Sequence, residues 1–172
     1  MDHLNEQINI TDFEAIYEEY YDRIYKYAFM LLLNKEDAED VTSETFMSAY
    51  AFWGTYDPSR SSVGTWLTRI AHNSAVNLLR SAAYTKRAEM PETWEQTDTK
   101  NDFTDRVEAR ETAIWLYSRL KPEEREFLNM RYVMELKDSE IGELMGLTVK
   151  TVNKRYQRLL LRCRKMLNDS DK

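Results

Sequence analysis

Apolar residues recur every three to four positions through most of the chain, a spacing typical of amphipathic helices packed against a core. In the first half this pattern predicts three helices, over about residues 12–33, 35–53 and 63–84. Asn34 is a suitable N-cap for the second helix, because a short polar side chain can accept hydrogen bonds from first-turn amides. Residues 54–62 contain one glycine, one proline and three serines, so they predict a loop before the third helix.

The middle of the chain, residues 85–104, is polar and has no apolar periodicity, so it predicts a mostly flexible linker. Helical spacing resumes after it and predicts four helices, over about residues 107–120, 122–132, 138–145 and 149–167. The sequence thus predicts an all-α fold of two small helical domains, residues 1–84 and 105–172. A coil of this length lets the two halves lie close together or far apart, so their arrangement is not predicted.

Residues 138–152 have the arrangement of a helix-turn-helix. Gly142 permits two helices to approach closely, and Gly146 permits a left-handed turn between them. Asp138 is a candidate cap for the first of these helices, and Thr148 for the second. An ordinary αα-hairpin with a solvated basic face would share part of this pattern.

The predicted last helix has two sides of different chemistry. Its outward side is polar and cationic and consists of Lys150, Asn153, Lys154, Gln157 and Arg158. Its inner side is predicted to be Val149, Val152, Tyr156, Leu159, Leu160 and Cys163. Short polar and cationic side chains at the start of such a helix can reach base edges and phosphates, so this segment favours DNA binding.

The net charge at first argues against that function, because the 172 residues include 24 basic and 30 acidic ones and carry a net charge of −6. Its distribution changes the picture. Residues 1–60 hold 13 acidic and 4 basic residues, whereas residues 116–172 hold 9 acidic and 13 basic ones. Between Leu144 and Leu167 there are seven cations and no acid. Blocks of one sign indicate partners of the opposite sign, although a solvated surface is the ordinary alternative.

Several classes of protein are disfavoured by composition. The one cysteine, Cys163, excludes a disulfide framework and a cysteine-based zinc finger, and it is predicted to be a small buried apolar residue. His3 and His72 are the two histidines, and neither is expected to have a catalytic or metal-binding role. There is no glycine-rich phosphate loop, so no cofactor or small-molecule substrate is expected. With no apolar run of about 20 residues and no signal-peptide pattern, we expect a cytoplasmic protein without membrane insertion.

Three motifs resemble those of a known family. Residues 37–46 (DAEDVTSETF) are similar to the pattern DAEDxxQExF, with Ser43 where glutamine is usual. Residues 65–73 (TWLTRIAHN) match TWLxRIAxN, and residues 120–125 (LKPEER) approach LPxxxR, with Lys121 as a departure. The chain therefore resembles a bacterial RNA polymerase sigma factor of the extracytoplasmic-function (ECF) class in the sigma-70 family. The resemblance makes residues 1–84 sigma domain two and residues 105–172 sigma domain four.

The resemblance implies a non-enzymatic role with no cofactor and assigns residues to three surfaces. Those expected to bind core RNA polymerase, on the coiled-coil clamp of its β′ subunit, are Asp37, Glu39, Asp40 and Glu44. Those expected to bind the −10 promoter element are Tyr56, Asp57, Ser59, Arg60, Ser61, Ser62, Arg69, Asn73, Asn77 and Arg80. Those expected at the −35 element are Lys150, Thr151, Asn153, Lys154, Arg155, Gln157 and Arg158. The polymerase β flap and an anti-sigma factor are further implied partners, and Trp66 is expected to support the core or the loop.

Two other interpretations fit parts of the sequence. A helix-turn-helix regulator that is not a sigma factor would use the first half for sensing or dimerisation. Copurification with core polymerase separates the two, because only a sigma factor must bind that enzyme. A helical adaptor protein would leave the cationic last helix unexplained.

Overall fold

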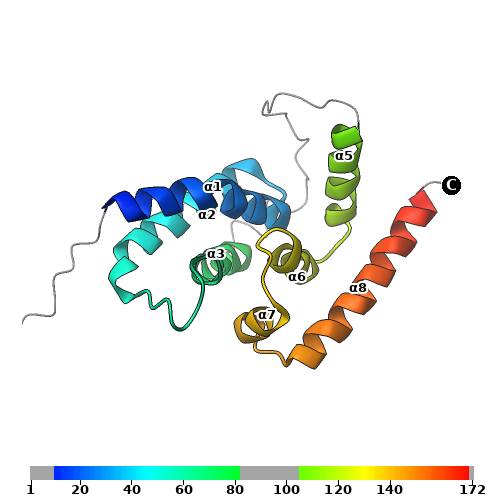
Figure 1. Ribbon diagram of the computed structural model, residues 1–172. Coiled ribbons are helices and arrows are strands. Elements are labelled where there is room, and N and C mark those ends of the chain that lie inside the picture. Colours follow the sequence, from blue (N-terminus) through cyan, green and yellow to red (C-terminus); the bar gives the residue numbers. More distant parts are fainter. Residues whose placement is uncertain (1–9, 82–104, 171–172) are drawn as a thin grey trace, which may run out of the picture.

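The computed structural model describes residues 10–81 and 105–170, and these residues form helices joined by short connections (Figure 1). The first half consists of α1 (Ile10–Leu32), α2 (Lys35–Ala51), the 3₁₀ turn η1 (Trp53–Thr55) and α3 (Val63–Arg80). The second half consists of α5 (Asp105–Ser118), α6 (Pro122–Tyr132), α7 (Asp138–Met145) and α8 (Val149–Ser170). The predicted all-α fold is confirmed, while the predicted linker over residues 85–104 lies outside the described residues.

Side-chain caps fix where several of these helices begin. The Asn34 side chain accepts a hydrogen bond from the Asp37 amide at 2.8 Å, as predicted, and Ser62 caps α3 through the Thr65 amide at 3.1 Å. Asp138 was predicted to cap α7 but is its first helical residue, and Lys137 occupies the cap position. The reason is that the Glu140 carboxylate, in the first turn of α7, accepts a hydrogen bond from the Lys137 amide at 2.8 Å. This bond supplies a partner for the backbone amide of the cap residue.

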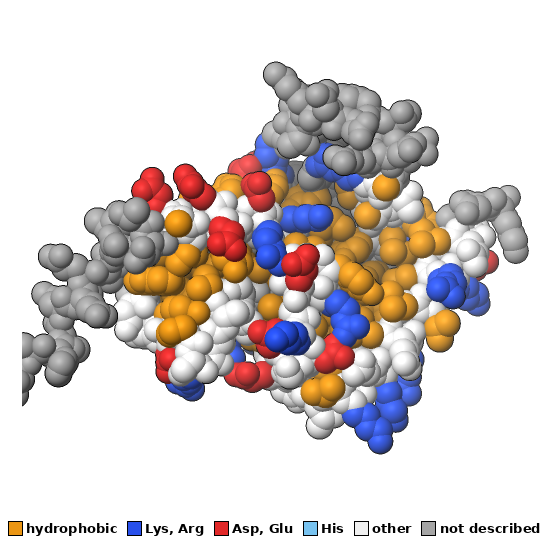
Figure 2. Space-filling view, in the orientation of Figure 1, with side chains coloured by type: hydrophobic (Ala, Val, Ile, Leu, Met, Phe, Trp, Pro, Cys, Tyr) orange, Lys and Arg blue, Asp and Glu red, His pale blue; other side chains and the backbone are white. Residues whose placement is uncertain are grey.

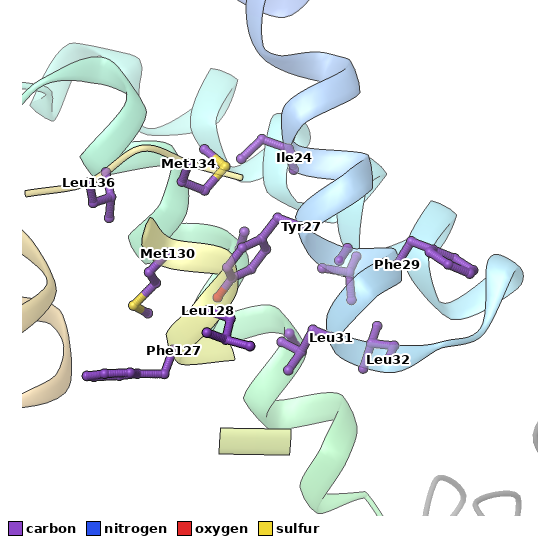
Figure 3. Close-up of a cluster of buried hydrophobic side chains, with 14 of the residues drawn as sticks. Ile24, Tyr27, Phe29, Leu31, Leu32, Phe127, Leu128, Met130, Met134 and Leu136 are labelled. Carbon is purple, nitrogen blue, oxygen red and sulfur yellow. The ribbon is translucent and has the colours of Figure 1, made fainter. Parts of the chain in front are cut away.

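The buried apolar side chains of both halves form one cluster (Figure 3). Its centre lies where α1 packs on α6, and the members drawn there include Ile24, Tyr27, Leu31, Phe127, Leu128 and Met130. Tyr27, Leu31 and Met130 are completely buried. The two halves, whose relative placement the sequence did not predict, are thus in direct contact in this structure and share a core.

The inner side of α8 differs in part from the prediction. Four of its predicted members are buried, namely Val152, Tyr156, Leu159 and Cys163. Val149 and Leu160 are 47% and 42% exposed, so their placement on the inner side was wrong. Leu160 follows the buried Leu159 and therefore points about 100° away from it around the helix. Val149 is the first residue of α8 and precedes the first buried position of the helix.

Charged side chains separate over the surface seen in Figure 2, with acids gathered over α1 and α2 and cations along α8. The same separation was visible in the sequence, where the first 60 residues are acidic and the last helix is cationic. Of the helices in the described residues, none is long and apolar enough to cross a membrane.

Candidate nucleic-acid interface

The turn between α7 and α8 has the geometry that the sequence predicted. Gly146 has a φ of 64°, in the left-handed region that favours glycine. A Cβ added to Gly142 would lie 2.6 Å from the backbone oxygen of Leu147, so only glycine fits this close approach. The Thr148 hydroxyl accepts a hydrogen bond from the Thr151 amide at 3.2 Å and caps α8. Val152 is fully buried, which fixes α8 against the turn.

This turn presents the outward side of α8 to solvent. All seven residues predicted for the −35 element lie on α8; Thr151 is half-buried and the other six are exposed. Asn153 donates a side-chain hydrogen bond to the Val149 carbonyl at 3.2 Å, which is a local contact within the helix. Among the described residues, no acid forms an ion pair with any of the four cations in this set. The arrangement provides an exposed cationic helix suited to a DNA groove.

The more distal cations of α8 have a different environment. Arg162 forms an ion pair with Glu124 of α6. A groove of about 310 Å³ runs between the two helices, and its lining is Glu123, Glu124, Phe127, Arg155, Arg158, Leu159 and Arg162. Arg162 therefore helps to hold α8 on α6.

Aromatic rings support the loop that precedes α3. Trp53 and Tyr56 stack with their ring centroids 5.3 Å apart, and Trp66 packs against both at 5.8 and 5.2 Å. The Tyr56 hydroxyl donates to the Ser61 carbonyl at 3.0 Å, which closes the loop on itself. Trp66 thus has the supporting position that was predicted for it.

Some predicted −10 residues also organise this loop internally. Asp57 accepts hydrogen bonds from the Ser59 hydroxyl at 2.7 Å and from the Ser59 amide at 2.9 Å. These hydrogen bonds lower the pKa of the Asp57 carboxyl, and the Arg60 charge lowers it further. The remaining loop candidates are Arg60 and Ser62, which are exposed, and Ser61, which is half-buried.

The predicted polar face of α3 lies on the surface as one stripe. Its members Arg69, Asn73, Asn77 and Arg80 are all exposed. Together with the loop, this stripe forms a polar strip over the first half of the molecule. The structure thus places the predicted −10 residues on the loop before α3 and along the exposed side of that helix.

The predicted polymerase-binding residues do not share one environment. Glu39, Asp40 and Glu44 are exposed on α2, whereas Asp37 is only 4% exposed in the first turn of that helix. The exposed apolar side chains of Met47 (73%) and Phe52 (59%) follow on and just after α2. The helical spacing did not indicate this exposed apolar pair, because Met47 and Phe52 lie outside the apolar stripe of the second helix and outside the motif at residues 37–46.

A buried polar cluster joins α1, α3 and α6. Glu126 is 5% exposed, and its Oε1 accepts a hydrogen bond from the Tyr27 hydroxyl at 2.7 Å. His72 Nδ1 lies against the same oxygen. Burial, and secondarily the Glu126 carboxylate, hold the pKa of Tyr27 well above its ordinary value. His72, which has no expected role in the sequence, therefore contributes to the contact between the two halves.

Arg125, the arginine of the LPxxxR-like motif, connects three helices. Its Nε donates to the Tyr117 and Leu120 carbonyls, at 2.8 and 3.0 Å, at the end of α5. Its Nη1 donates to the Leu31 carbonyl at 3.0 Å, in the last turn of α1. Carbonyls in the last turn of a helix lack the full set of helix amides as partners, so one guanidinium helps to satisfy the ends of two helices.

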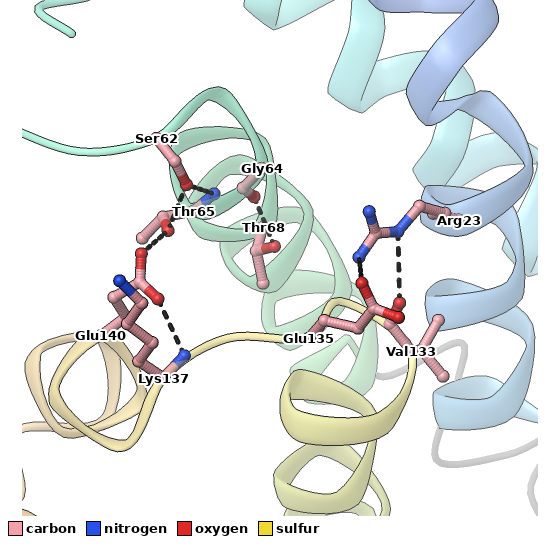
Figure 4. A network of polar contacts seen from close by, with 9 residues as sticks. All are labelled: Arg23, Ser62, Gly64, Thr65, Thr68, Val133, Glu135, Lys137 and Glu140. Carbon is pink, nitrogen blue, oxygen red and sulfur yellow. Dashed lines mark hydrogen bonds and ion pairs between the residues drawn. The ribbon is translucent and has the colours of Figure 1, made fainter.

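Two more groups of contacts lie at the edge of the same interface (Figure 4). Arg23 of α1 donates to the Val133 carbonyl and pairs with Glu135 at 3.2 Å. Near the start of α3, the Thr65 hydroxyl donates to the Glu140 carboxylate of α7 at 2.5 Å. Arg69 pairs with Glu143 of α7 at 2.7 Å. Nothing in the helical spacing alone signals these contacts, because the residues are more than 70 positions apart.

Taken together, these features describe a two-part helical DNA-binding protein, with a polar strip on one half and a helix-turn-helix on the other. Comparison with protein families agrees with both parts: the model of sigma-70 region 2 matches residues 16–85, and that of sigma-70 region 4 matches residues 116–163. The chain belongs to the ECF sigma factors of the sigma-70 family, whose members direct RNA polymerase to promoters.

Individual relatives cover most of the chain. The ECF RNA polymerase sigma factor SigW of Bacillus subtilis is 30% identical over 168 residues, which cover 91% of this chain and 89% of SigW. The ECF RNA polymerase sigma factor BldN of Streptomyces coelicolor is 30% identical over 156 residues, 87% of this chain but 59% of BldN. The RNA polymerase sigma factor YlaC of Bacillus subtilis is 29% identical, with 92% of its length covered.

Solved structures confirm the fold. The sigma factor RpoE of Bartonella quintana, in complex with the anti-sigma factor NepR, superposes with a TM-score of 0.73 at 18% identity and covers 92% of this chain and 98% of its own. CnrH, in complex with the cytosolic domain of CnrY, gives 0.70 at 20% identity and covers 96% of this chain and 92% of its own.

Proposed function

We propose that this protein binds core RNA polymerase and directs it to a specific set of promoters, where it also assists opening of the DNA. The observation that carries the proposal is the combination, in one chain, of matches to sigma regions two and four with an exposed cationic recognition helix. The action is one of binding and positioning, so no catalytic residue is assigned. Its place of work is the cytoplasm, where the polymerase and the DNA are found.

Three surfaces divide this work. The outward side of α8 contacts the −35 element, because cations and amides there can reach phosphates and base edges in a major groove. The loop before α3 and the stripe from Arg69 to Arg80 contact the −10 element, where an unpaired base needs hydrogen-bonding groups around it. The exposed acids of α2, namely Glu39, Asp40 and Glu44, contact the polymerase clamp. Opposite charges across such an interface steer the encounter and fix its orientation.

The burial of Asp37 affects the proposed polymerase surface. In this structure its carboxylate cannot meet a partner directly, because only 4% of the residue is exposed. We assign it to the start of α2 and leave the three exposed acids to bind the clamp. The apolar Met47 and Phe52 beside them add a contact area that desolvates on binding.

An anti-sigma factor is the proposed regulatory partner. RpoE of Bartonella quintana, which shares this fold, was crystallised with the anti-sigma factor NepR. CnrH, which also shares it, was solved with the cytosolic domain of CnrY. We propose that a protein of this kind binds the present chain and keeps it from the polymerase.

A run-off transcription experiment on genomic DNA tests the proposal, with purified core polymerase in the presence or absence of the chain. We expect defined transcripts only when the chain is present. The double variant Lys154→Ala/Arg158→Ala should lose most of them, whereas Lys26→Ala, which removes an exposed cation from α1, should keep them. Initiation that is independent of the chain would contradict the proposal. Failure to copurify with core polymerase would favour the helix-turn-helix regulator instead.

A gel-shift experiment tests how the acidic surface affects DNA binding. With a net charge of −6, the free chain should bind duplex DNA poorly, because its acidic parts repel the phosphates. Binding should appear with core polymerase. Equally tight binding without the polymerase would contradict the claim that the acidic parts of the free chain oppose DNA binding.

A further inference from the structure

Arg131, in the last turn of α6, contacts both helices of the helix-turn-helix. Its guanidinium pairs with the carboxylate of Asp138, the first residue of α7. The central carbon of the same guanidinium lies 4.0 Å from the ring centroid of Tyr156 on α8, which is within the range of a cation–π contact. One side chain of α6 thus connects the start of α7 to the recognition helix.

Tyr156 is the residue through which α6 holds α8. It is 2% exposed, and its hydroxyl donates a hydrogen bond to the Phe127 carbonyl of α6. Its ring centroid lies 4.3 Å from that of Phe127, and the Arg131 guanidinium adds a third contact from the same helix. Tyr156 follows the buried Val152 by four residues, so it fixes α8 one turn beyond the helix-turn-helix turn.

The orientation of α8 at Tyr156 matters for how DNA is read. Tyr156 lies inside the stretch from Lys150 to Arg158 that is proposed to contact the −35 element, so a rotation there would move its outward side chains together. Hydrogen bonds to base edges tolerate little displacement, because they need distances of about 3 Å and good alignment. The attraction of cations to phosphates is less directional and survives such a rotation better. Orientation therefore affects sequence selection more than overall attraction to DNA.

Asp138 orients the guanidinium from the side of α7. It was predicted to cap that helix, but Lys137 occupies the cap position and the Asp138 carboxylate pairs with Arg131. The Arg131 and Asp138 side chains are 30% and 23% exposed, so their attraction is screened less than that of a fully exposed pair. A planar guanidinium can donate along its edge while its face lies on an aromatic ring, whereas an ammonium group cannot do both. The arrangement therefore calls for arginine at position 131.

We infer that Arg131 is a positioning residue for recognition of the −35 element. It acts through Tyr156 and Asp138, holds α8 in the orientation that reads base edges, and makes no contact with DNA itself. This role rests on the proposed function and deepens it, because it separates selection of a promoter sequence from attraction to the phosphates. The residues of α8 supply both, and Arg131 supports the first.

The test measures the sequence preference of the holoenzyme. A promoter found by run-off transcription is made into a library with a randomised −35 element, and the fraction bound by the holoenzyme is sequenced. The readout is the ratio of affinities between the best and the average −35 sequence. This ratio does not depend on the fraction of folded protein, so a merely structural loss does not change it. Arg131→Lys, which keeps the charge but loses the planar group, should lower the ratio roughly three- to fivefold.

The matched control is Arg119→Lys. Arg119 also stacks on an aromatic ring, that of Trp115 at 3.9 Å, and its hydrogen bonds are to Trp115 and Ser118 of α5. This variant should keep the full ratio, and an equal loss would overturn the inference. In a second library, randomised at the −10 element of the same promoter, Arg131→Lys should match the wild type. A loss of preference there as well would also overturn the specific link to α8.

Arg131→Gln separates positioning from direct contact with DNA. Removal of a cation that neutralises a phosphate lowers the slope of log affinity against log salt by about 1. Arg131→Gln should lower the −35 ratio and leave this slope unchanged. A fall in slope equal to that of Arg158→Ala would overturn the inference, because Arg131 would then contact a phosphate.

The remaining outcomes separate this role from the proposed function. Circular dichroism checks folding, and if Arg131→Lys does not fold, Asp138→Asn replaces it, because it removes the ion pair and leaves the Tyr156 contact. A full −35 ratio in the variant used would overturn only the role of Arg131. Wild-type holoenzyme that selects no −35 sequence would overturn the proposed function, and the role of Arg131 with it.

Discussion

The two surfaces proposed to meet DNA are α8 and α3, and they use the same kinds of side chain in different surroundings. On α8, the cations project into solvent from a helix fixed by Gly142, Gly146 and Val152. On α3, Arg69 is paired with Glu143 and the neighbouring Thr65 with Glu140. The comparison teaches that a DNA-binding surface is defined by what surrounds its cations as well as by the cations themselves.

The two surfaces also depend on the fold in different ways. The position of α8 comes from a local turn of the second half, whereas the surroundings of α3 depend on the packing of the two halves. Disturbing the turn should therefore displace α8, whereas disturbing the buried contact between the halves should change the surroundings of α3 and leave α8 in place. The following predictions separate these two effects.

The largest effect is expected from Gly142→Ala. The added methyl group would lie 2.6 Å from the Leu147 backbone oxygen, and a backbone atom cannot move aside cheaply. We expect a loss of about 3 kcal/mol in the free energy of unfolding, measured by urea denaturation, together with loss of promoter binding by the holoenzyme. The control Gly54→Ala should change little, because no atom lies within 4 Å of the added group. A loss below about 1 kcal/mol would show that the turn is not as tight as described.

A smaller loss is expected from Glu126→Ala, which acts on the contact between the halves. It leaves the buried Tyr27 hydroxyl and the His72 ring without their acceptor, at a cost of roughly 2 kcal/mol in urea denaturation. Amide hydrogen exchange at the start of α3 should become faster, while exchange in α8 stays unchanged. The control is Glu123→Ala, an exposed acid on the same helix, which should be nearly neutral. Equal acceleration in α3 and α8 would remove the distinction between the two surfaces.

Charge removal on α8 should have a moderate effect on binding and almost none on stability. Lys154→Ala and Arg158→Ala should each weaken promoter binding by the holoenzyme several-fold and lower the slope of log affinity against log salt by about 1. Lys26→Ala on α1 serves as the control for loss of a cation elsewhere. An unchanged salt slope in both α8 variants would mean that these cations do not neutralise phosphates.

The smallest change between a variant and the wild type is expected in the reactivity of Cys163, on the inner side of α8. Burial raises the pKa of its thiol, and the Arg162 charge opposes this less strongly, so the folded chain holds little thiolate. At pH 8, reaction with a thiol reagent such as DTNB should be on the order of 100-fold slower than in urea. The Glu126→Ala variant should remain as slow, because α8 stays docked on α6. Fast reaction in that variant would show that α8 depends on the contact between the halves.

Much of the fold follows from the sequence because the features that define a helix lie between residues close together in the chain. Helical spacing, the Asn34 cap and the two glycines of the turn act between residues close in the chain, so the all-α class and the helix-turn-helix are predictable. The outward side of α8 follows in the same way. The prediction of its inner side was wrong at Val149 and Leu160, because periodicity does not tell where along a helix its packing partner begins and ends.

The packing of the two halves could not be predicted in this way. Arg125 and Glu126 are polar residues in a helical segment, and no local rule indicates that they reach α1. The buried position of Asp37 is a similar case, since an acid in the first turn of a helix is ordinarily solvated. These features depend on contacts between residues far apart in the chain.

The contacts that hold the halves together differ in how they would appear in an alignment of related sequences. Arg125 and Asn129 donate to the backbone carbonyls of Leu31 and Tyr27, at 3.0 and 3.1 Å. A carbonyl oxygen is present whatever side chain stands at a position, so α1 can change its residues there without a matching change on α6. Pairwise covariation should therefore be weak at these contacts and concentrated on the side-chain cluster of Tyr27, His72 and Glu126. A method that infers contacts from covariation would then detect the centre of this interface and underestimate its extent.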